Sequence, residues 1–234
     1  MRKIGLIGGV GWRSTQTYYR ILNEEVARRL GGLRSPRLAI ESLDFAEVRA
    51  LVDAGREDEL RSLYLDATLA LKSSGAQVLA LCSNAAHTRL PYLEEAAKTS
   101  FVHIAAPLVR EIRARRYGRV LLLGTRETME RDFMKDALAA GGAQVVVPDE
   151  IDRLWLHSTI FGDLERGTAT TAQKARLCAL IADHGRAGAD AAILGCTELP
   201  LLVGPGDTEL PCLDTTQIHA SALIDAALKE SSAP

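Results

Sequence analysis

An internal repeat constrains the fold of this chain more than any other feature. The segment SGAQVLALCSN, residues 74–84, aligns without a gap with AGADAAILGCT, residues 187–197, at an offset of 113 residues. A second match pairs KIGLIGG, residues 3–9, with RVLLLGT, residues 119–125. Self-similarity at a fixed spacing is the sequence signature of repeated structural units. The sequence therefore predicts two related α/β domains with a small-molecule site between them, where such pockets are common.

Both copies of the longer repeat have the pattern of a buried parallel strand that ends in polar residues. A short, continuous apolar run is typical of a strand covered on both faces. Ser83 and Asn84 follow the first run, and Cys196 and Thr197 follow the second at the aligned positions. Ligands of open α/β sheets bind outside the carboxyl ends of the strands. Ser83 and Cys196 are therefore candidate site residues, one from each half.

Cys196 has two interpretations. Gly195 permits a close approach of the backbone, and a thiol facing the amides of a helix start has a route to a lowered pKa and a reactive thiolate. Thr197 would then cap the turn that follows. The alternative is a buried core position, since most free cysteines are small buried hydrophobic residues.

The bulk composition excludes several classes of protein. With 234 residues, 47% of them hydrophobic and 25% charged, the chain can bury one large core or two modest ones. A formal charge of −2 provides no basic field, so neither nucleic acid nor a membrane is an expected partner. No apolar run reaches about 18 residues, and MRKIGLIGG does not resemble a signal peptide, so a cytoplasmic protein is expected.

The four cysteines favour free thiols. They stand at positions 82, 178, 196 and 212 and form no C-x-x-C pair or zinc spacing, so neither a disulfide framework nor a structural metal is expected. Strand alternation turns Cys82 away from Ser83 and into the core. Cys178 is expected to be buried within a helix.

The glycine turn GGVGW, which includes Gly9 and Val10, follows the first strand. It matches neither G-x-G-x-x-G nor a P-loop, so the nucleotide interpretation is weak. Its backbone amides could instead bind a small carboxylate, as helix amino termini do. A plain strand-to-helix turn, with Ser14 or Thr15 as the helix cap, fits the same residues.

Three further polar residues have a functional and a structural interpretation each. Arg49, in the polar loop 44–49, could bind a substrate carboxylate as a charged fork or could be solvated. His87 could be a general acid or base, or could pack and orient the loop after Asn84. Thr125, at a strand end, could offer its hydroxyl to a carboxylate or could cap a helix.

Other positions are expected to be structural. His157 and His184 have no functional pattern around them. The spacing of Tyr19, Leu22, Val26 and Leu30 predicts one buried helical face. Further strands are expected at 37–43, 101–107, 119–124 and 144–148, and a short strand and a helix over 211–230 are expected to return to the first domain.

Five motifs carry a resemblance that spans nearly the whole chain. At GGVGWRST, LCSNAAH, LLGTRETMERDF, LGCTELPLLV and DTTQIHA the sequence resembles the aspartate/glutamate racemase family, in its branch of broad amino-acid racemases. The resemblance implies an α/β fold of two pseudo-symmetric domains, each a parallel sheet flanked by helices, with the active site in the cleft between them. We expect residues 1–105 plus 212–234 to form the first domain and 106–211 the second. It also implies a homodimer without cofactor or metal.

The resemblance also implies residue roles. Family members use two thiols that face each other across the substrate α-carbon; Cys196 matches the thiol of the second domain, and Ser83 stands where the first domain usually has a cysteine. Asn84 and Thr197 would hold the α-carboxylate or α-amino group. A hydroxyl is a far weaker acid than a thiol of pKa about 8.5, so the two sides of the site differ. The other substrate-binding candidates are Gly9, Val10, Arg49, Thr125 and Glu198.

The expected activity is therefore that of an isomerase in D-amino acid metabolism. It would racemise an amino acid without pyridoxal phosphate (PLP), by α-proton abstraction with Cys196 and reprotonation on the Ser83 side. One alternative is an arylmalonate-type decarboxylase that uses Cys196 as its single proton donor. Another is a non-catalytic amino-acid binding protein. In aspartate-specific relatives a basic residue near the position of Glu165 and Arg166 grips the distal carboxylate, and a Glu165 in that place would favour a neutral or hydroxylated side chain.

Overall fold

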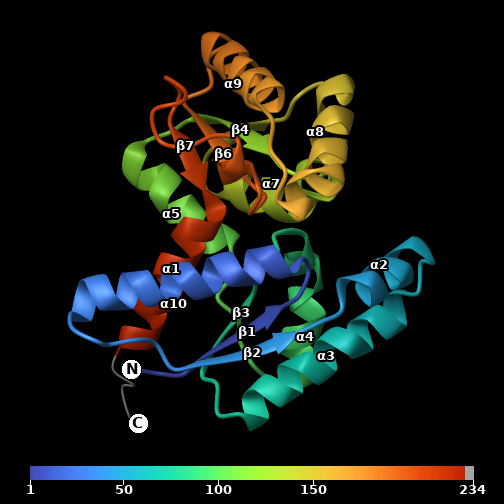
Figure 1. Cartoon of the computed structure of the whole chain (residues 1–234), viewed down its shortest axis with the longest axis vertical. Helices are drawn as coiled ribbons and strands as arrows, with labels where there is room; N and C mark the ends of the chain where they lie inside the picture. The colour runs from blue at the N-terminus through green and yellow to red at the C-terminus, as the bar shows by residue number, and fades with distance from the viewer. Residues whose placement is uncertain (230–234) are drawn as a thin grey trace. The chain divides into compact units, whose positions relative to one another are not determined.

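The computed structural model describes residues 1–229 and divides the chain into two compact units (Figure 1). The first unit contains residues 1–103 and the segment from His219 onward, and the second contains residues 104–218. In the part of the chain that the structure describes, no helix has both the length and the apolar character needed to cross a membrane.

The first unit alternates strands and helices. Its strands are β1 (Ile4–Gly8), β2 (Leu38–Ser42) and β3 (Val78–Leu81), and its helices are α1 (Trp12–Leu30), α2 (Phe45–Asp53), α3 (Glu57–Ser73), the short η1 (Ala85–Arg89) and α4 (Leu90–Ala97). Helix α10 (Thr215–Leu228) begins in the second unit and ends in the first.

The first unit is a parallel sheet in the order β2-β1-β3 with helices on both faces (Figure 1). Side chains alternate between the faces, as they do along any strand. Leu6 and Ala80 pack with α1 and α10 on one face, whereas Ile7 and Leu81 pack with α2, α3 and α4 on the other. Strands β1 and β3 are buried along their whole length, which explains their continuous apolar runs in the sequence, whereas the edge strand β2 is partly exposed.

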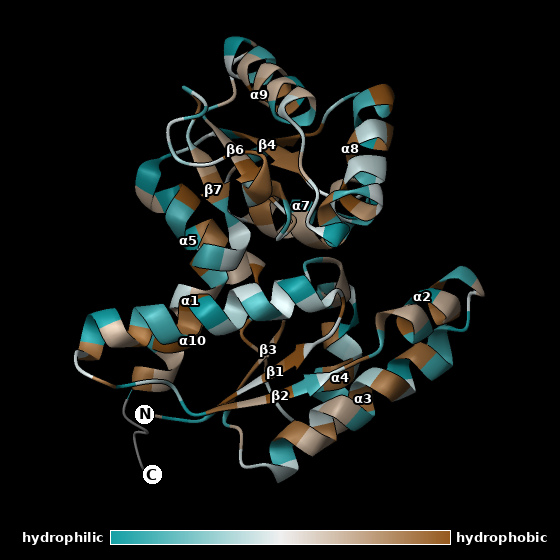
Figure 2. Cartoon of the chain, in the orientation of Figure 1, coloured by the Kyte–Doolittle hydropathy of each residue, from teal (hydrophilic) through white to brown (hydrophobic). Residues whose placement is uncertain are grey.

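The second unit repeats this plan around four parallel strands in the order β5-β4-β6-β7. Its elements are α5 (Ala105–Arg115), β4 (Arg119–Leu123), α6 (Arg126–Glu130), α7 (Asp132–Ala140), β5 (Gln144–Val146), α8 (Glu150–Gly162), η2 (Leu164–Arg166), α9 (Thr171–Arg186), β6 (Ala191–Leu194), η3 (Leu199–Leu201) and β7 (Cys212–Asp214). Helices α5 and α7 cover one face of the sheet, and α8 and α9 cover the other. After Arg119, the central strands β4 and β6 consist of buried hydrophobic residues (Figure 2).

The internal repeat corresponds to matching positions in the two sheets. The offset of 113 residues places β3 on β6, and the second match places β1 on β4. In each sheet these two strands pair with each other in parallel. The predicted fold class, α/β with two parallel sheets flanked by helices, is confirmed.

One strand prediction was wrong. Within 101–107 only Phe101 forms an isolated bridge, to Leu79, and α5 begins at Ala105. Pro107 lies in the first turn of α5, where a missing N–H costs nothing because that group has no partner within the helix. The residues that appear strand-like in the sequence therefore begin a helix.

Two helices also differ from the sequence expectations. Most of the segment 44–49, expected to be a polar loop, belongs to α2 (Phe45–Asp53), whose first turn is capped by the Asp44 carboxylate that accepts from Ala46 N at 2.9 Å. In α1 the buried face contains Tyr18 and Ile21, while Tyr19 is 52% exposed. Leu22 and Val26 are buried as predicted, so only the ends of the predicted face, Tyr19 and Leu30, were wrong.

The chain returns to the first unit later than the predicted domain boundary. Residues 212–234 were expected in the first domain, but β7 hydrogen-bonds to β6 as the edge strand of the second sheet. Only from His219, inside α10, does the chain pack with the first unit.

Candidate active site

The glycine turn after β1 is held from within α1. Gly9 has a φ of +84°, and a Cβ there would lie 2.0 Å from the Leu43 carbonyl oxygen, so only glycine fits. The Gly9 N–H donates to Thr15 Oγ1 at 2.9 Å. Thr15, one of the two residues expected to cap the helix, therefore closes the turn instead, and α1 begins at a Gly11 cap without a side-chain hydrogen bond. Val10 is partly buried against the core below.

Ser83 and Asn84 lie at the same edge of the sheet as Gly9. The hydrogen bond from Cys82 N to the Ile7 carbonyl, 2.9 Å, continues the pairing of β1 and β3 by one step, so Ser83 follows at the level of Gly9. Cys82 is 2% exposed and points into the core, as strand alternation predicted. Ser83 is half-buried and Asn84 is buried at the start of η1.

His87 packs against the turn formed by Ser83 and Asn84. Its Nδ1 lies 2.8 Å from the Ser83 carbonyl oxygen, and the ring is 1% exposed. Burial, followed by the neighbouring His219 and His103, lowers the pKa of His87 well below its usual range, so the ring is neutral. This contact favours the loop-orienting role over that of a general acid or base.

Arg49 lies on the surface of α2. Its guanidinium forms an ion pair with Asp53 at 2.6 Å, four residues along the same helix. The two side chains are 40% and 62% exposed, as expected for the solvated alternative rather than for a buried carboxylate fork.

In the second unit a pair of glycines brings the ends of β4 and β6 together. The Gly195 N–H donates to the Leu123 carbonyl oxygen at 2.7 Å, and a Cβ on Gly195 would lie 2.7 Å from that oxygen. A Cβ on Gly124 would lie 3.0 Å from the Gly195 carbonyl oxygen. The predicted close approach at Gly195 is confirmed. Thr125 and Cys196 follow at neighbouring positions of the same edge.

The Cys196 thiol is hydrogen-bonded to a buried carboxylate. Its Sγ donates to Glu198 Oε2 at 2.9 Å, and Thr197 Oγ1 donates to Glu198 Oε1 at 2.7 Å. Glu198 is 3% exposed. Both oxygens of this carboxylate thus hold the residues that precede it, and Thr197 bonds to Glu198 instead of capping the turn.

The predicted lowering of the Cys196 pKa was wrong. Burial raises the pKa of the thiol well above its usual range, and the charge and hydrogen bond of Glu198 and the charge of Glu165 raise it further. The structural reason is that η3 has three residues, Leu199–Leu201, and so has little dipole to offer. Cys196 in this arrangement is a protonated thiol beside a proton acceptor.

Thr125 caps α6, which is the structural one of its two interpretations. Its Oγ1 accepts from Thr128 N at 3.4 Å, and the two hydroxyl oxygens are also 3.4 Å apart. Thr128 is 1% exposed and was missed in the sequence. The spacing of Thr125 and Thr128, three residues apart at a helix start, was the available signal.

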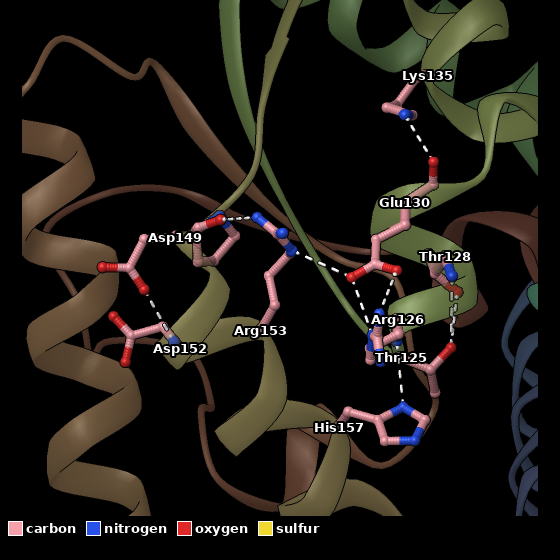
Figure 3. A network of polar contacts seen from close by, with 10 residues as sticks. Thr125, Arg126, Thr128, Glu130, Lys135, Asp149, Asp152, Arg153 and His157 are labelled. Atoms are coloured by element: carbon pink, nitrogen blue, oxygen red, sulfur yellow. Dashed lines mark hydrogen bonds and ion pairs between the residues drawn. The ribbon is translucent and has the colours of Figure 1, made fainter.

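A polar network fixes the short helix α6 against α8 (Figure 3). The Arg126 N–H donates to His157 Nδ1 at 3.2 Å, and Glu130 pairs with Arg126 at 3.0 Å and with Arg153 at 3.3 Å. Arg153 also donates to the Pro148 carbonyl at 2.8 Å. His157 therefore has the structural role expected, and bonds from α8 fix the start of α6 next to Thr125.

The four cysteines are free, as predicted. Cys178 is partly rather than fully buried and lines a surface hollow together with Thr208 and Leu210. Among the described residues no group of three or more His, Cys, Asp or Glu side chains is placed to hold a metal ion.

Each unit thus gathers polar groups at the carboxyl ends of its strands. The first offers the Ser83 hydroxyl, the Asn84 amide and the glycine turn at Gly9. The second offers the thiol of Cys196 with the Glu198 carboxylate as its proton acceptor. This second set can exchange a proton with a bound molecule, because thiol and carboxylate share one hydrogen bond.

The sequence matches known proteins along most of its length. Residues 7–223 match the family described as Asp/Glu/Hydantoin racemase. The broad specificity amino-acid racemase RacX of Bacillus subtilis (strain 168) is 22% identical over 235 residues, which cover 96% of this chain and 98% of that protein. A crystal structure of a candidate Asp/Glu racemase from Yersinia pestis has a TM-score of 0.91 and 36% identity, and an aspartate racemase homologue from Pyrococcus horikoshii OT3 has a TM-score of 0.87 and 32% identity. Each of these two matches covers 98% of this chain and 100% of the chain in the solved structure.

Proposed function

The chain belongs to the Asp/Glu/hydantoin racemase family, and on that premise we propose that it is a cofactor-independent amino-acid racemase of the broad-specificity branch, with Ser83 in place of the first catalytic cysteine. The observation that carries the proposal is the hydrogen bond of 2.9 Å between the Cys196 thiol and the buried Glu198 carboxylate. It provides a thiol that can lose its proton to an adjacent group inside a dry site.

Glu198 makes Cys196 usable as a base. The Sγ proton moves along the existing hydrogen bond to Oε2, which leaves a thiolate beside a neutral carboxyl group. Because Glu198 becomes neutral as Cys196 ionises, the transfer avoids placing two negative charges side by side, and that repulsion is one cause of the raised pKa of Cys196. The thiolate then takes the α-proton of the substrate, and the electron pair of the broken C–H bond remains on the substrate as an enolate-like carbanion.

The carbanion regains a proton on the other face. We propose that this step takes place on the Ser83 side, with the hydroxyl of Ser83 relaying a proton from water, and that Asn84 and Thr197 bind the α-carboxylate or α-amino group. The extra proton held by Cys196 and Glu198 then returns to solvent, where it neutralises the hydroxide left on the Ser83 side and restores the starting state. Preorganised hydrogen bonds to the developing charge are the main means of lowering such a barrier. A serine hydroxyl is a poor base, so removal of the α-proton from the Ser83 side is the slower direction.

The negative charge near the Cys196 thiol affects which substrate side chains are favoured. Glu198 and Glu165 both contribute negative charge that raises the pKa of Cys196. A distal carboxylate on the substrate would add to this repulsion. We propose that amino acids with neutral or hydroxylated side chains exchange faster than aspartate and glutamate.

One observation favours a second candidate function. The Cys196 thiol is protonated, and a single protonated thiol is what an arylmalonate-type decarboxylase needs to deliver a proton to its enolate. Such an enzyme would release carbon dioxide from disubstituted malonates and would not exchange the α-proton of amino acids.

The test is a screen of deuterium wash-in from heavy water at the α-carbon of each amino acid in both configurations. We expect exchange with the parent enzyme and a loss of at least about 10³-fold in Cys196→Ala, since a general base contributes on the order of 10² to 10⁴ in rate. Cys178→Ala, which removes a partly buried thiol of α9, is the matched control and should exchange as the parent does. Near-parental exchange by Cys196→Ala contradicts the mechanism, and binding without exchange by the parent indicates a non-catalytic protein.

A further inference from the structure

His87, four residues after Ser83, closes the turn at the end of β3 with two hydrogen bonds, one from its backbone and one from its ring. The His87 N–H donates to the Asn84 carbonyl at 3.1 Å, and the His87 ring contacts the Ser83 carbonyl at 2.8 Å. A carbonyl oxygen can only accept, so Nδ1 of the ring carries the proton. The bond joins the ring to the residue at the end of β3, four positions earlier in the chain.

Neighbouring rings fix the orientation of His87. Its ring centroid lies 5.0 Å from that of His103 and 5.5 Å from that of His219, with interplanar angles of 66° and 68°. His219 is itself held at both nitrogens, because its Nε2 donates to the Val102 carbonyl at 2.7 Å and its Nδ1 accepts from the Tyr18 hydroxyl at 2.7 Å. The His87 ring therefore cannot turn away from Ser83 without disturbing a second buried histidine.

The second ring nitrogen of His87, Nε2, argues against a purely space-filling role for the ring. Nε2 is buried and has no hydrogen-bond partner among the described residues. Burying a polar atom without a partner is unfavourable, so a residue that only filled space would be better apolar. The hydrogen bonds that the His87 ring makes go to the backbone of the same turn, at Ser83 and Asn84.

We propose that His87 is a positioning residue whose Nδ1–H holds the Ser83 carbonyl and thereby fixes the place of the Ser83 hydroxyl at the end of β3. This inference rests on the proposed racemase function, in which Ser83 serves one face of the α-carbon. It assigns His87 no proton transfer to or from the substrate.

The test compares three substitutions at His87 with a matched control. His87→Asn can present a side-chain N–H at the position of Nδ1, whereas His87→Leu has no donor and His87→Gln carries its amide one carbon further out. His184 on α9 makes the same ring-to-carbonyl contact, from Nδ1 to the Leu180 carbonyl at 3.0 Å, in the other unit. His184→Leu is therefore the control for loss of such a bond as such.

The first measurement is the initial rate of deuterium wash-in for each pure enantiomer. For the Leu and Gln variants we expect wash-in from the enantiomer served by Ser83 to fall about tenfold or more, because a misplacement of about 1 Å can cost on the order of 10²-fold. Wash-in from the enantiomer served by Cys196 should fall far less, and the Asn variant should recover most of the loss. An equal loss for both enantiomers, or no recovery with Asn, overturns the proposal.

The second measurement does not depend on activity. Cys82 precedes Ser83 and is buried, so its rate of alkylation, followed by peptide mass spectrometry, reports opening of the turn. The Leu and Gln variants should label Cys82 faster than the parent, and the Asn and His184→Leu variants should not. A parent without any exchange refutes the proposed function alone; unchanged labelling of Cys82 in the Leu and Gln variants overturns the positioning role. If the Leu variant does not fold, the Asn and Gln pair decides.

Discussion

The thiol of Cys196, the proposed base, lies beside the Glu198 carboxylate, and this neighbour affects the pH at which it ionises. Catalytic thiols are commonly activated by histidine, lysine or a helix amino terminus, which lower the pKa. Cys196 has burial and Glu198 instead, and both raise its pKa. A high pKa makes the thiolate rarer at neutral pH but a stronger base once formed, which suits removal of a weakly acidic α-proton.

Glu198→Gln should separate the two effects of this carboxylate. Loss of the negative charge lowers the pKa of Cys196, so the pH midpoint for alkylation of the thiol should move to lower pH. Deuterium exchange should nevertheless fall about 10²-fold, because the group that accepts the Sγ proton is gone. The measurement is the pH profile of iodoacetamide labelling of Cys196 beside the exchange rate.

Glu165→Gln is the control for this prediction. Glu165 acts on Cys196 through its charge alone and is the smallest of the causes that raise the pKa, so the labelling midpoint should move less than in Glu198→Gln. A midpoint that is the same in Glu198→Gln and in the parent would contradict the account of the thiol.

Ser83→Cys should make the two directions of exchange more alike. A thiol is a much stronger acid than a serine hydroxyl and can act as a base on the Ser83 face. The initial wash-in should therefore accelerate for the slower enantiomer, while the equilibrium ratio of the enantiomers stays at one. Ser83→Ala should slow that enantiomer further, and equal initial rates for both enantiomers in the parent would contradict the single strong base.

The positions of Ser83 and Cys196 could be predicted from sequence, but the ionisation of Cys196 could not. The internal repeat aligns the two residues, and the strand pattern places each at a strand end. The pKa depends on Glu198 turning back so that its carboxylate meets the residue two positions earlier. That turn is a matter of tertiary geometry, which spacing alone does not reveal.

Among the elements, β4 and β6 depend on glycines where they end. Gly195→Ala would place a Cβ 2.7 Å from the Leu123 carbonyl oxygen, which is backbone and cannot move aside without shifting β4. We expect a loss of about 1 to 3 kcal/mol in the free energy of unfolding, the usual cost of overpacking. Urea denaturation followed by circular dichroism measures it.

Gly185→Ala is the matched glycine control. It lies in α9, and a Cβ there would meet Leu210 at 3.6 Å, an ordinary contact distance. Alanine is the better helix former, so this variant should be as stable as the parent or more so. An equal loss in both variants would show that the close approach at Gly195 has no special cost.

The elements with a clear apolar period were predicted well, and those whose ends are decided by single residues were not. The strands at β1, β3, β4 and β6 follow from continuous apolar runs. By contrast, the helix α2 depends on the Asp44 cap, and α5 takes over a segment that also fits a strand. Periodicity cannot decide between strand and helix over so few residues.

At the scale of the molecule, buried histidines make the first unit sensitive to acid. Burial lowers the pKa of His219 to about 4, below the value of about 6.5 for an unfolded chain. Between these values the unfolded state binds more protons, so stability falls as the pH falls from about 6.5 toward 4. At pH 5 we expect His219 alone to account for about 2 kcal/mol relative to pH 7.

Urea denaturation at pH 7 and pH 5 tests this dependence. The parent should lose stability at pH 5, and His219→Asn, though less stable throughout, should lose less between the two pH values. His184→Asn removes a partly exposed histidine of α9 and should keep the dependence of the parent. An unchanged pH dependence in His219→Asn would contradict the assignment.

The return of the chain through α10 has a consequence for biosynthesis. One face of the first sheet, with Leu6 and Ala80, is covered in part by Ala220, Leu223 and Ile224, which the ribosome adds only after the whole second unit. The second unit is a continuous stretch and can bury its core as soon as it emerges. The amino-terminal half must wait with an apolar face open to water, so it is the nascent first unit that chaperones would meet.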